Sequence, residues 1–71
     1  MQRTPVTSSN IASIGYDPDE KVLEVEFLDG SVYQYHGVPE THYRNLMVAS
    51  SHGTYLDTYI KKGGFRYVKV R

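Results

Sequence analysis

Residues 21–35 read KVLEVEFLDGSVYQY, and this stretch decides the fold. Apolar and acidic residues alternate from Leu23 to Phe27, which is typical of a strand with one buried and one solvated face. Asp29 and Gly30 follow after one residue, and an Asp-Gly pair between two such segments predicts a tight hairpin. The returning strand then carries two tyrosines, in the sequence YQY.

The length of the hairpin loop determines which side chains share a face, because a slip of one residue turns every side chain to the opposite side. A two-residue loop would pair Leu28 with Ser31 and place both tyrosines opposite glutamates. A three-residue loop, with Gly30 in a left-handed conformation, pairs Phe27 with Ser31 instead. We predict this second register because it gathers large apolar side chains on one face: Leu23, Val25, Phe27, Tyr33 and Tyr35.

The sequence on either side of the hairpin predicts further strands and two helices. Proline is favoured at the first helical position, so Val38-Pro39 indicates a helix start, and Gly53 indicates its end. A capping-box variant at Thr54–Asp57 indicates the start of a second helix. The expected elements are, in chain order, a strand at 10–16, a turn at 17–20, a helix at 38–53, a shorter helix at 54–64 and a strand at 65–70.

These elements predict an α+β fold, in which a three-stranded antiparallel meander is followed by two helices and a final C-terminal strand. The helices are expected to cover one face of the sheet. Residues 1–5 are expected to be a flexible N-terminus and residues 6–71 a single domain. Phe27, Leu46 and Leu56 are expected in the core, one from a strand and one from each helix.

The composition limits what can hold the domain together and where it acts. The chain has 71 residues and no cysteine, which excludes a disulfide or thiolate metal site, so packing, with seven Tyr and two Phe, must stabilise it. No apolar stretch approaches the ~20 residues of a membrane span, and no secretory signal begins the chain. We therefore expect a cytoplasmic protein without membrane contact. Net charge is zero, but residues 1–30 are acidic and residues 31–71 are basic, which indicates either a partner surface or two halves that attract each other.

The C-terminal segment is the strongest candidate for a functional site. Residues 59–71 contain five basic side chains, three aromatic ones and no acid. Cations contact phosphates and aromatic faces stack on unpaired bases, so this composition favours nucleic acid. Strand alternation would, however, split the cations between two faces, and lysines on an edge strand also deter aggregation. The candidate nucleic-acid-binding residues are Lys61, Lys62, Phe65, Arg66, Tyr67, Lys69 and Arg71.

Other polar groups give weaker hypotheses. The run Thr7, Ser8, Ser9 and Asn10 could bind a ligand through its hydroxyls, although such runs more often cap turns. The three histidines lack the spacing of a metal site, so no metal and no cofactor are expected. Adjacent Ser51 and His52 would point in different directions on a helix, and helix capping explains the serines better than catalysis. An enzyme is therefore not expected.

The order and spacing of several short sequences resemble the KTSC domain, which is found at the C-terminus of some lysyl-tRNA synthetases. The resemblance covers residues 6–70 and includes VTSSNI (6–11), IGYD (14–17), LEVEF (23–27), YQY (33–35), Val38-Pro39, Tyr43, Leu46, Ala49, Ser51, Gly53 and Tyr55. It implies a short free-standing protein of bacterial or phage type, and no catalytic residue or aminoacylation. RNA binding, of tRNA type, follows only by association with the synthetases. We expect an accessory module for RNA or another nucleic acid, or alternatively a protein–protein interaction module.

Overall fold

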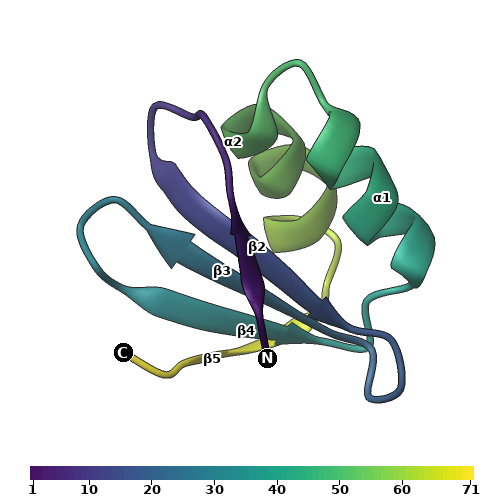
Figure 1. The fold of residues 1–71 in the computed structure, drawn as a ribbon. Helices are drawn as coiled ribbons and strands as arrows, with labels where there is room; N and C mark the ends of the chain where they lie inside the picture. Colours follow the sequence, from purple (N-terminus) through teal and green to yellow (C-terminus); the bar gives the residue numbers. More distant parts are fainter.

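Five antiparallel strands form one sheet in chain order, and three helical segments cover one of its faces (Figure 1). This computed structural model describes residues 1–71. The strands are β1 (Arg3–Pro5), β2 (Ile11–Asp17), β3 (Val22–Phe27), β4 (Val32–His36) and β5 (Arg66–Lys69). Between β4 and β5 lie helix α1 (Glu40–Val48), the short helix α2 (His52–Tyr55) and a π-helical segment, η1 (Leu56–Lys61). The expected α+β class is confirmed.

The β3–β4 hairpin has the predicted three-residue loop. The Phe27 amide donates to the Ser31 carbonyl at 2.8 Å, and the Gly30 amide donates to the Phe27 carbonyl at 2.9 Å. Gly30 has φ 90°, a conformation that a residue with a side chain rarely adopts. Val25 therefore pairs with Tyr33 and Leu23 pairs with Tyr35, which places the tyrosines on the apolar face.

The expected number of strands was one too small. Arg3–Pro5, placed in a flexible terminus by the sequence, form the edge strand β1 and pair with β2, so four meander strands precede the helices. The close approach requires a glycine, because a Cβ on Gly15 would lie 2.5 Å from the Gln2 carbonyl oxygen. Three polar or conformationally restricted residues carry no hydrophobic alternation, which is why the pattern missed this strand.

A bulge in β2 explains a second difference. The register against β3 shifts between Ile11 and Ser13, so alternation breaks there. Ile11 and Ile14 are three residues apart, yet both are fully buried in the same core cluster. Strict alternation would place Ile11 and Ile14 on opposite faces of the strand.

The helices also begin and end at different residues than expected. Helix α1 starts after Pro39 and ends at Val48, four residues before His52 opens the next helical segment. Ser51, rather than Thr54, caps that segment, because its Oγ accepts a hydrogen bond from the Thr54 amide. Both helices still present their expected core side chains. Leu46 and Leu56 are buried at 0% and 1% exposure, whereas Phe27 is only half-buried at the margin of the core.

Candidate functional site

An aromatic hollow of about 400 Å³ opens beside the margin of the core. Phe27, Tyr33 and Tyr35 line it from the β3–β4 hairpin, Tyr67 from β5 and Lys61 from the end of η1. Tyr35 pairs directly with Tyr67 across the two strands, and Tyr33 pairs with Lys69. The hairpin register and the return of β5 after the helices therefore bring four rings and two lysines to one face of the sheet. We call these six residues the aromatic–basic surface.

The rings of this surface contact one another edge to face or at a tilt, and none of these pairs is parallel. Phe27 and Tyr33 meet edge to face at 83°, and Tyr67 is tilted by 47° to Tyr33 and by 39° to Tyr35. Tyr67 is 63% exposed, whereas Tyr35 is 3% exposed and forms the deepest part of the hollow. Burial, followed by the neighbouring Tyr33 and Tyr67, raises the pKa of Tyr35 to about 12. Its hydroxyl is therefore uncharged at neutral pH.

Both lysines of the aromatic–basic surface are free of ion pairs. The Lys61 ammonium lies 5.2 Å from the centre of the Phe27 ring, within the range of a cation–π interaction. Lys69 lies opposite Tyr33 on the neighbouring strand, and directly paired residues share a face. Two positive charges without an ion-pair partner thus border the rings.

The other predicted residues of the C-terminal segment lie elsewhere. Lys62 points to Asp57, 3.4 Å away, and Phe65 packs against the core and the edge of the His42 ring. Arg66 turns to the opposite face of β5 by strand alternation. Arg71 also lies on that opposite face, because the amides of both Val70 and Arg71 donate to the Val32 carbonyl and the alternation breaks there.

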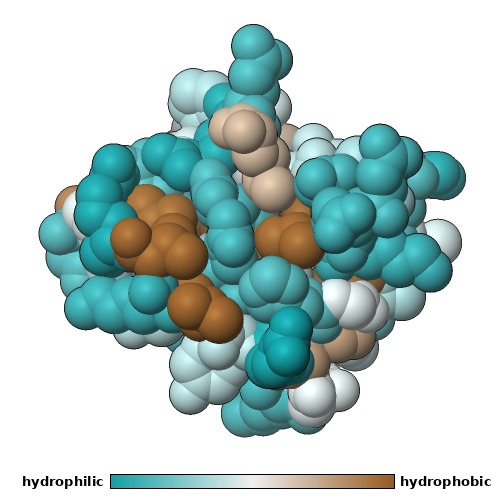
Figure 2. All heavy atoms as spheres, turned by 90° about the horizontal axis from the view of Figure 1, so that it is seen from below, coloured by the Kyte–Doolittle hydropathy of each residue, from teal (hydrophilic) through white to brown (hydrophobic).

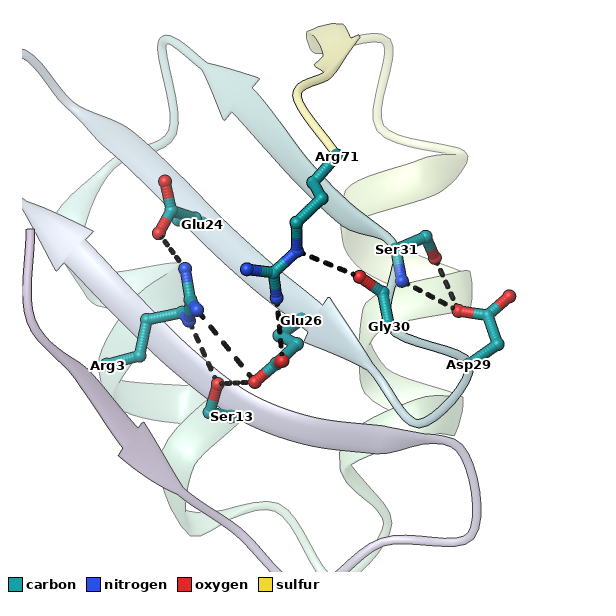
Figure 3. Close-up of polar contacts among 8 residues, drawn as sticks. All are labelled: Arg3, Ser13, Glu24, Glu26, Asp29, Gly30, Ser31 and Arg71. Carbon is teal, nitrogen blue, oxygen red and sulfur yellow. Dashed lines mark hydrogen bonds and ion pairs between the residues drawn. The ribbon is translucent and has the colours of Figure 1, made fainter.

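The face of the sheet away from the helices carries a network of charged side chains (Figure 3). Arg3 contacts Glu24, and its Nε donates to Ser13 Oγ at 3.0 Å. Arg71 lies 2.9 Å from Glu26 and also donates to the Gly30 carbonyl. Glu24 is 8% exposed, although the alternation of the sequence placed it on a solvated face.

The pKa of Glu24 indicates that this network stabilises the ionised form of its carboxyl. Burial alone would raise the pKa of this carboxyl, but hydrogen bonds from Gln34 and Arg3 and the Arg3 charge outweigh burial and hold it below its usual value. Gln34 Nε2 donates to one carboxylate oxygen at 2.8 Å, and Arg3 binds the other. The carboxylates of Glu24 and Glu26 are therefore both matched by arginines inside the fold.

The N-terminal polar run lines a second, smaller hollow of about 300 Å³ with no apolar side chain. Thr7, Ser8 and Ser9 meet Ser50, Ser51 and His52 there. The side chains of Ser8, Ser51 and His52 have hydrogen-bond partners within the fold. Ser8 Oγ accepts from the amides of Asn10 and Ile11, and His52 Nδ1 lies 2.8 Å from the Leu46 carbonyl. Ser8 therefore caps the turn that leads into β2.

No three His, Cys, Asp or Glu side chains lie close enough together to hold a metal ion. None of the helical segments combines the length and the apolar character that crossing a lipid bilayer requires.

Sequence reasoning found Lys61, Tyr67 and Lys69 but missed the hairpin side of the aromatic–basic surface. The signal was available in part, because the predicted register already placed Phe27, Tyr33 and Tyr35 on one face. Only the pairing of β5 with β4, across the intervening helices, joins that face to Tyr67.

Comparison with known proteins identifies the family of this chain. Residues 7–67 match the KTSC domain. An uncharacterized protein of Stutzerimonas stutzeri (strain A1501) is 37% identical over 70 residues, covering 99% of both chains. A lysine–tRNA ligase of Nostoc sp. is 41% identical over 62 residues, which are 87% of this chain and 11% of the ligase. The crystal structure of a KTSC domain protein from Yersinia pestis is 51% identical, with a TM-score of 0.90 over 99% of this chain and 97% of that one. The expected resemblance is thereby confirmed, and the chain belongs to the KTSC domain family.

Proposed function

We propose that this chain is a cytoplasmic, non-enzymatic module that binds single-stranded nucleic acid, RNA in particular. The observation that carries the proposal is the aromatic–basic surface, where unpaired Lys61 and Lys69 border the exposed ring of Tyr67. Lysines neutralise phosphates, and exposed aromatic rings stack on bases that are not paired. A related sequence within a protein named lysine–tRNA ligase supports RNA as the polymer.

The charge distribution favours a polyanion over other ligands of this surface. The acidic residues on the far face are matched by Arg3 and Arg71, so they neither attract nor repel a ligand bound beyond the sheet. The lysines on the near face have no such partners. A net charge of zero therefore still leaves one face locally positive, which is the electrostatic requirement for contacting a phosphate backbone.

A protein-binding role is the second candidate, and the edge strand β5 favours it. Its four residues are all exposed, and Val68 and Val70 add apolar surface at 46% and 48% exposure. An exposed edge can accept a strand from a partner. Against this role, hydrophobic atoms on the face seen in Figure 2 form small patches separated by hydrophilic ones. Stable protein interfaces have a more continuous apolar centre.

The non-enzymatic part of the proposal rests on the second hollow, where a serine and a histidine come closest to a catalytic arrangement. Ser51 Oγ accepts a hydrogen bond from the Thr54 amide and donates one to the Thr54 hydroxyl. The Nδ1 of His52 lies within hydrogen-bond distance of the Leu46 carbonyl. A nucleophilic serine needs a base within hydrogen-bond reach and a third group that orients it. Capping accounts for these contacts without any chemistry.

The proposal is tested by fluorescence anisotropy of labelled tRNA, single-stranded RNA and single-stranded DNA at two salt concentrations. We expect affinity to fall with salt, because phosphate contacts release counterions. The double variant Lys61→Gln/Lys69→Gln should weaken binding to all sequences alike and reduce the slope of log affinity against log salt by about 0.7–1 per lysine.

Lys62→Gln is the matched control, since it removes a neighbouring charge that faces Asp57. It should leave both the affinity and the salt slope close to those of the unmodified protein. Absence of binding to every polymer at low salt would refute the proposal. Binding that Lys62→Gln weakens as much as the double variant would move the site away from the aromatic–basic surface.

A further inference from the structure

We infer that the aromatic hollow is a binding site for one unpaired nucleobase, which stacks on Tyr67 while its flanking phosphates contact Lys61 and Lys69. This inference rests on the proposed function and adds the recognised unit. It also predicts a preference that phosphate contacts alone would not give, namely dependence on the presence of a base.

The rings of the hollow do not stack in parallel on one another. Elsewhere in this protein, Tyr16 and Tyr43 stack on each other, with centroids 5.1 Å apart and an interplanar angle of 11°. Within the hollow no pair is parallel, and the angles run from 39° to 83°. The rings at the site are therefore held edge to face or tilted, and the exposed face of Tyr67 is free for a planar ligand.

The size and shape of the hollow also favour a single base. A hollow of about 400 Å³ lies at the lower end of the volumes that small-molecule sites occupy, which suits a single planar ring system. Bases of a double helix are paired and stacked, so their faces cannot enter such a hollow. Only a base outside a duplex, in a loop, an end or a single strand, presents a face to Tyr67.

The charges of the side chains around the hollow also suit the phosphates that flank a base. Lys61 lies over the Phe27 ring and has no carboxylate partner, so a phosphate can recruit it without breaking an ion pair. Lys69 lies opposite Tyr33, on the same face of the sheet. The Tyr35 hydroxyl is uncharged at neutral pH, and burial raises its pKa further, so the floor of the hollow does not repel an anion.

The experiment separates base recognition from backbone contact. Two labelled oligonucleotides of about seven units are compared by anisotropy at low salt, a length within the usual site sizes of single-strand binders. One is abasic throughout, and the other carries a single adenine at its centre. Since both have the same phosphates, we expect the base to increase affinity about 5- to 150-fold, the range of one base–aromatic stack.

Tyr67→Ala should abolish the difference between the two oligonucleotides, and Tyr67→Phe should retain it, because a phenyl ring still stacks. Tyr59→Ala is the control, since Tyr59 is 52% exposed on η1 and lies outside the hollow. Equal affinity of the unmodified protein for both oligonucleotides would overturn the inference while leaving the proposed function standing. No binding of either one, or of any RNA, would overturn both. A base effect that survives Tyr67→Ala would also overturn the inference.

Discussion

The two faces of the sheet differ in how their charged side chains are paired. On the face away from the helices, the carboxylates of Glu24 and Glu26 are held by Arg3 and Arg71 (Figure 3). On the face toward the helices, apolar side chains fill the core, and where the helical cover ends, lysines and tyrosines remain unmatched. The carboxylates of one face are matched within the fold, whereas the lysines at the margin of the other face have no ion-pair partner.

This difference teaches that a count of charges along the sequence is a poor guide to a binding surface. The C-terminal segment carries five cations in thirteen residues, but the fold uses Arg71 to bind Glu26 and Lys62 to bind Asp57. A basic tail thus divides into structural and available charges. The division depends on the bulge at Val70 and on the pairing of β5, neither of which is visible in composition.

The largest expected effect concerns the helix-covered face. Leu46→Ala removes a fully buried side chain from the centre of the core, and such truncations lower the free energy of unfolding by about 2–5 kcal/mol. Urea denaturation followed by circular dichroism measures the loss. Val48→Ala, at an 81% exposed position of the same helix, should change stability by less than about 0.5 kcal/mol. Similar losses in both variants would mean that α1 presents a different side to the sheet.

The open face should respond more weakly. Arg3→Ala leaves the carboxylate of Glu24 nearly buried without its cation, which should lower the free energy of unfolding by about 1–2 kcal/mol. Arg44→Ala is the matched control, because it breaks only an exposed pair with Glu40, worth at most about 0.5 kcal/mol.

The pair of Arg3 and Glu24 also predicts how the free energy of unfolding changes at acidic pH. Because the folded-state pKa of Glu24 is lowered, its contribution is complete above the unfolded-state value and is lost as the pH falls through the folded one. Stability of the Arg3→Ala variant should therefore vary less with pH at the acid end. A curve parallel to that of the unmodified protein would show that Arg3 does not stabilise the ionised carboxyl.

The smallest effect lies at the floor of the hollow and appears only at alkaline pH. The pKa of Tyr35 is about 12 in the folded state against 10.0 in its ordinary environment, so its contribution is complete below pH 10 and is lost between pH 10 and 12. At pH 11 the loss is on the order of 1 kcal/mol. Tyr35→Phe should remove this part of the alkaline decline in urea denaturation, whereas Tyr59→Phe, at an exposed position, should keep it. Parallel curves for all three proteins would contradict the burial of the Tyr35 hydroxyl.

Much of the fold could be predicted because local signals agreed with the tertiary structure. The alternation in β3, the Asp-Gly turn and the two apolar helix stripes gave the hairpin register and the core side chains Leu46 and Leu56. The strand β1 could not be predicted, because it depends on pairing with Gly15 and on the contact between Arg3 and Glu24, both distant in sequence.

The candidate site was only half predictable for a related reason. Tyr67 and Lys69 stand out in a basic, aromatic tail, whereas Phe27 and Tyr33 belong to a hairpin that looks like ordinary core. Their meeting depends on where β5 returns after 29 residues of loops and helices, which run from Gly37 to Phe65 between the ends of β4 and β5. Periodicity describes one segment at a time and does not record that return.

The short strand β1 has a further consequence for solubility. Behind it, β2 contributes the fully buried Ile11 and Ile14, and an uncovered strand of this kind would be a template for pairing with other chains. Val6 donates its amide inward to Ala12, so Pro5, one residue earlier, turns toward solvent and has no amide to offer there. We therefore expect the three residues of β1, which carry no hydrophobic pattern, to limit aggregation at this edge of the sheet. Gly15 permits this arrangement, because it has no side chain to obstruct the approach of β1 to β2.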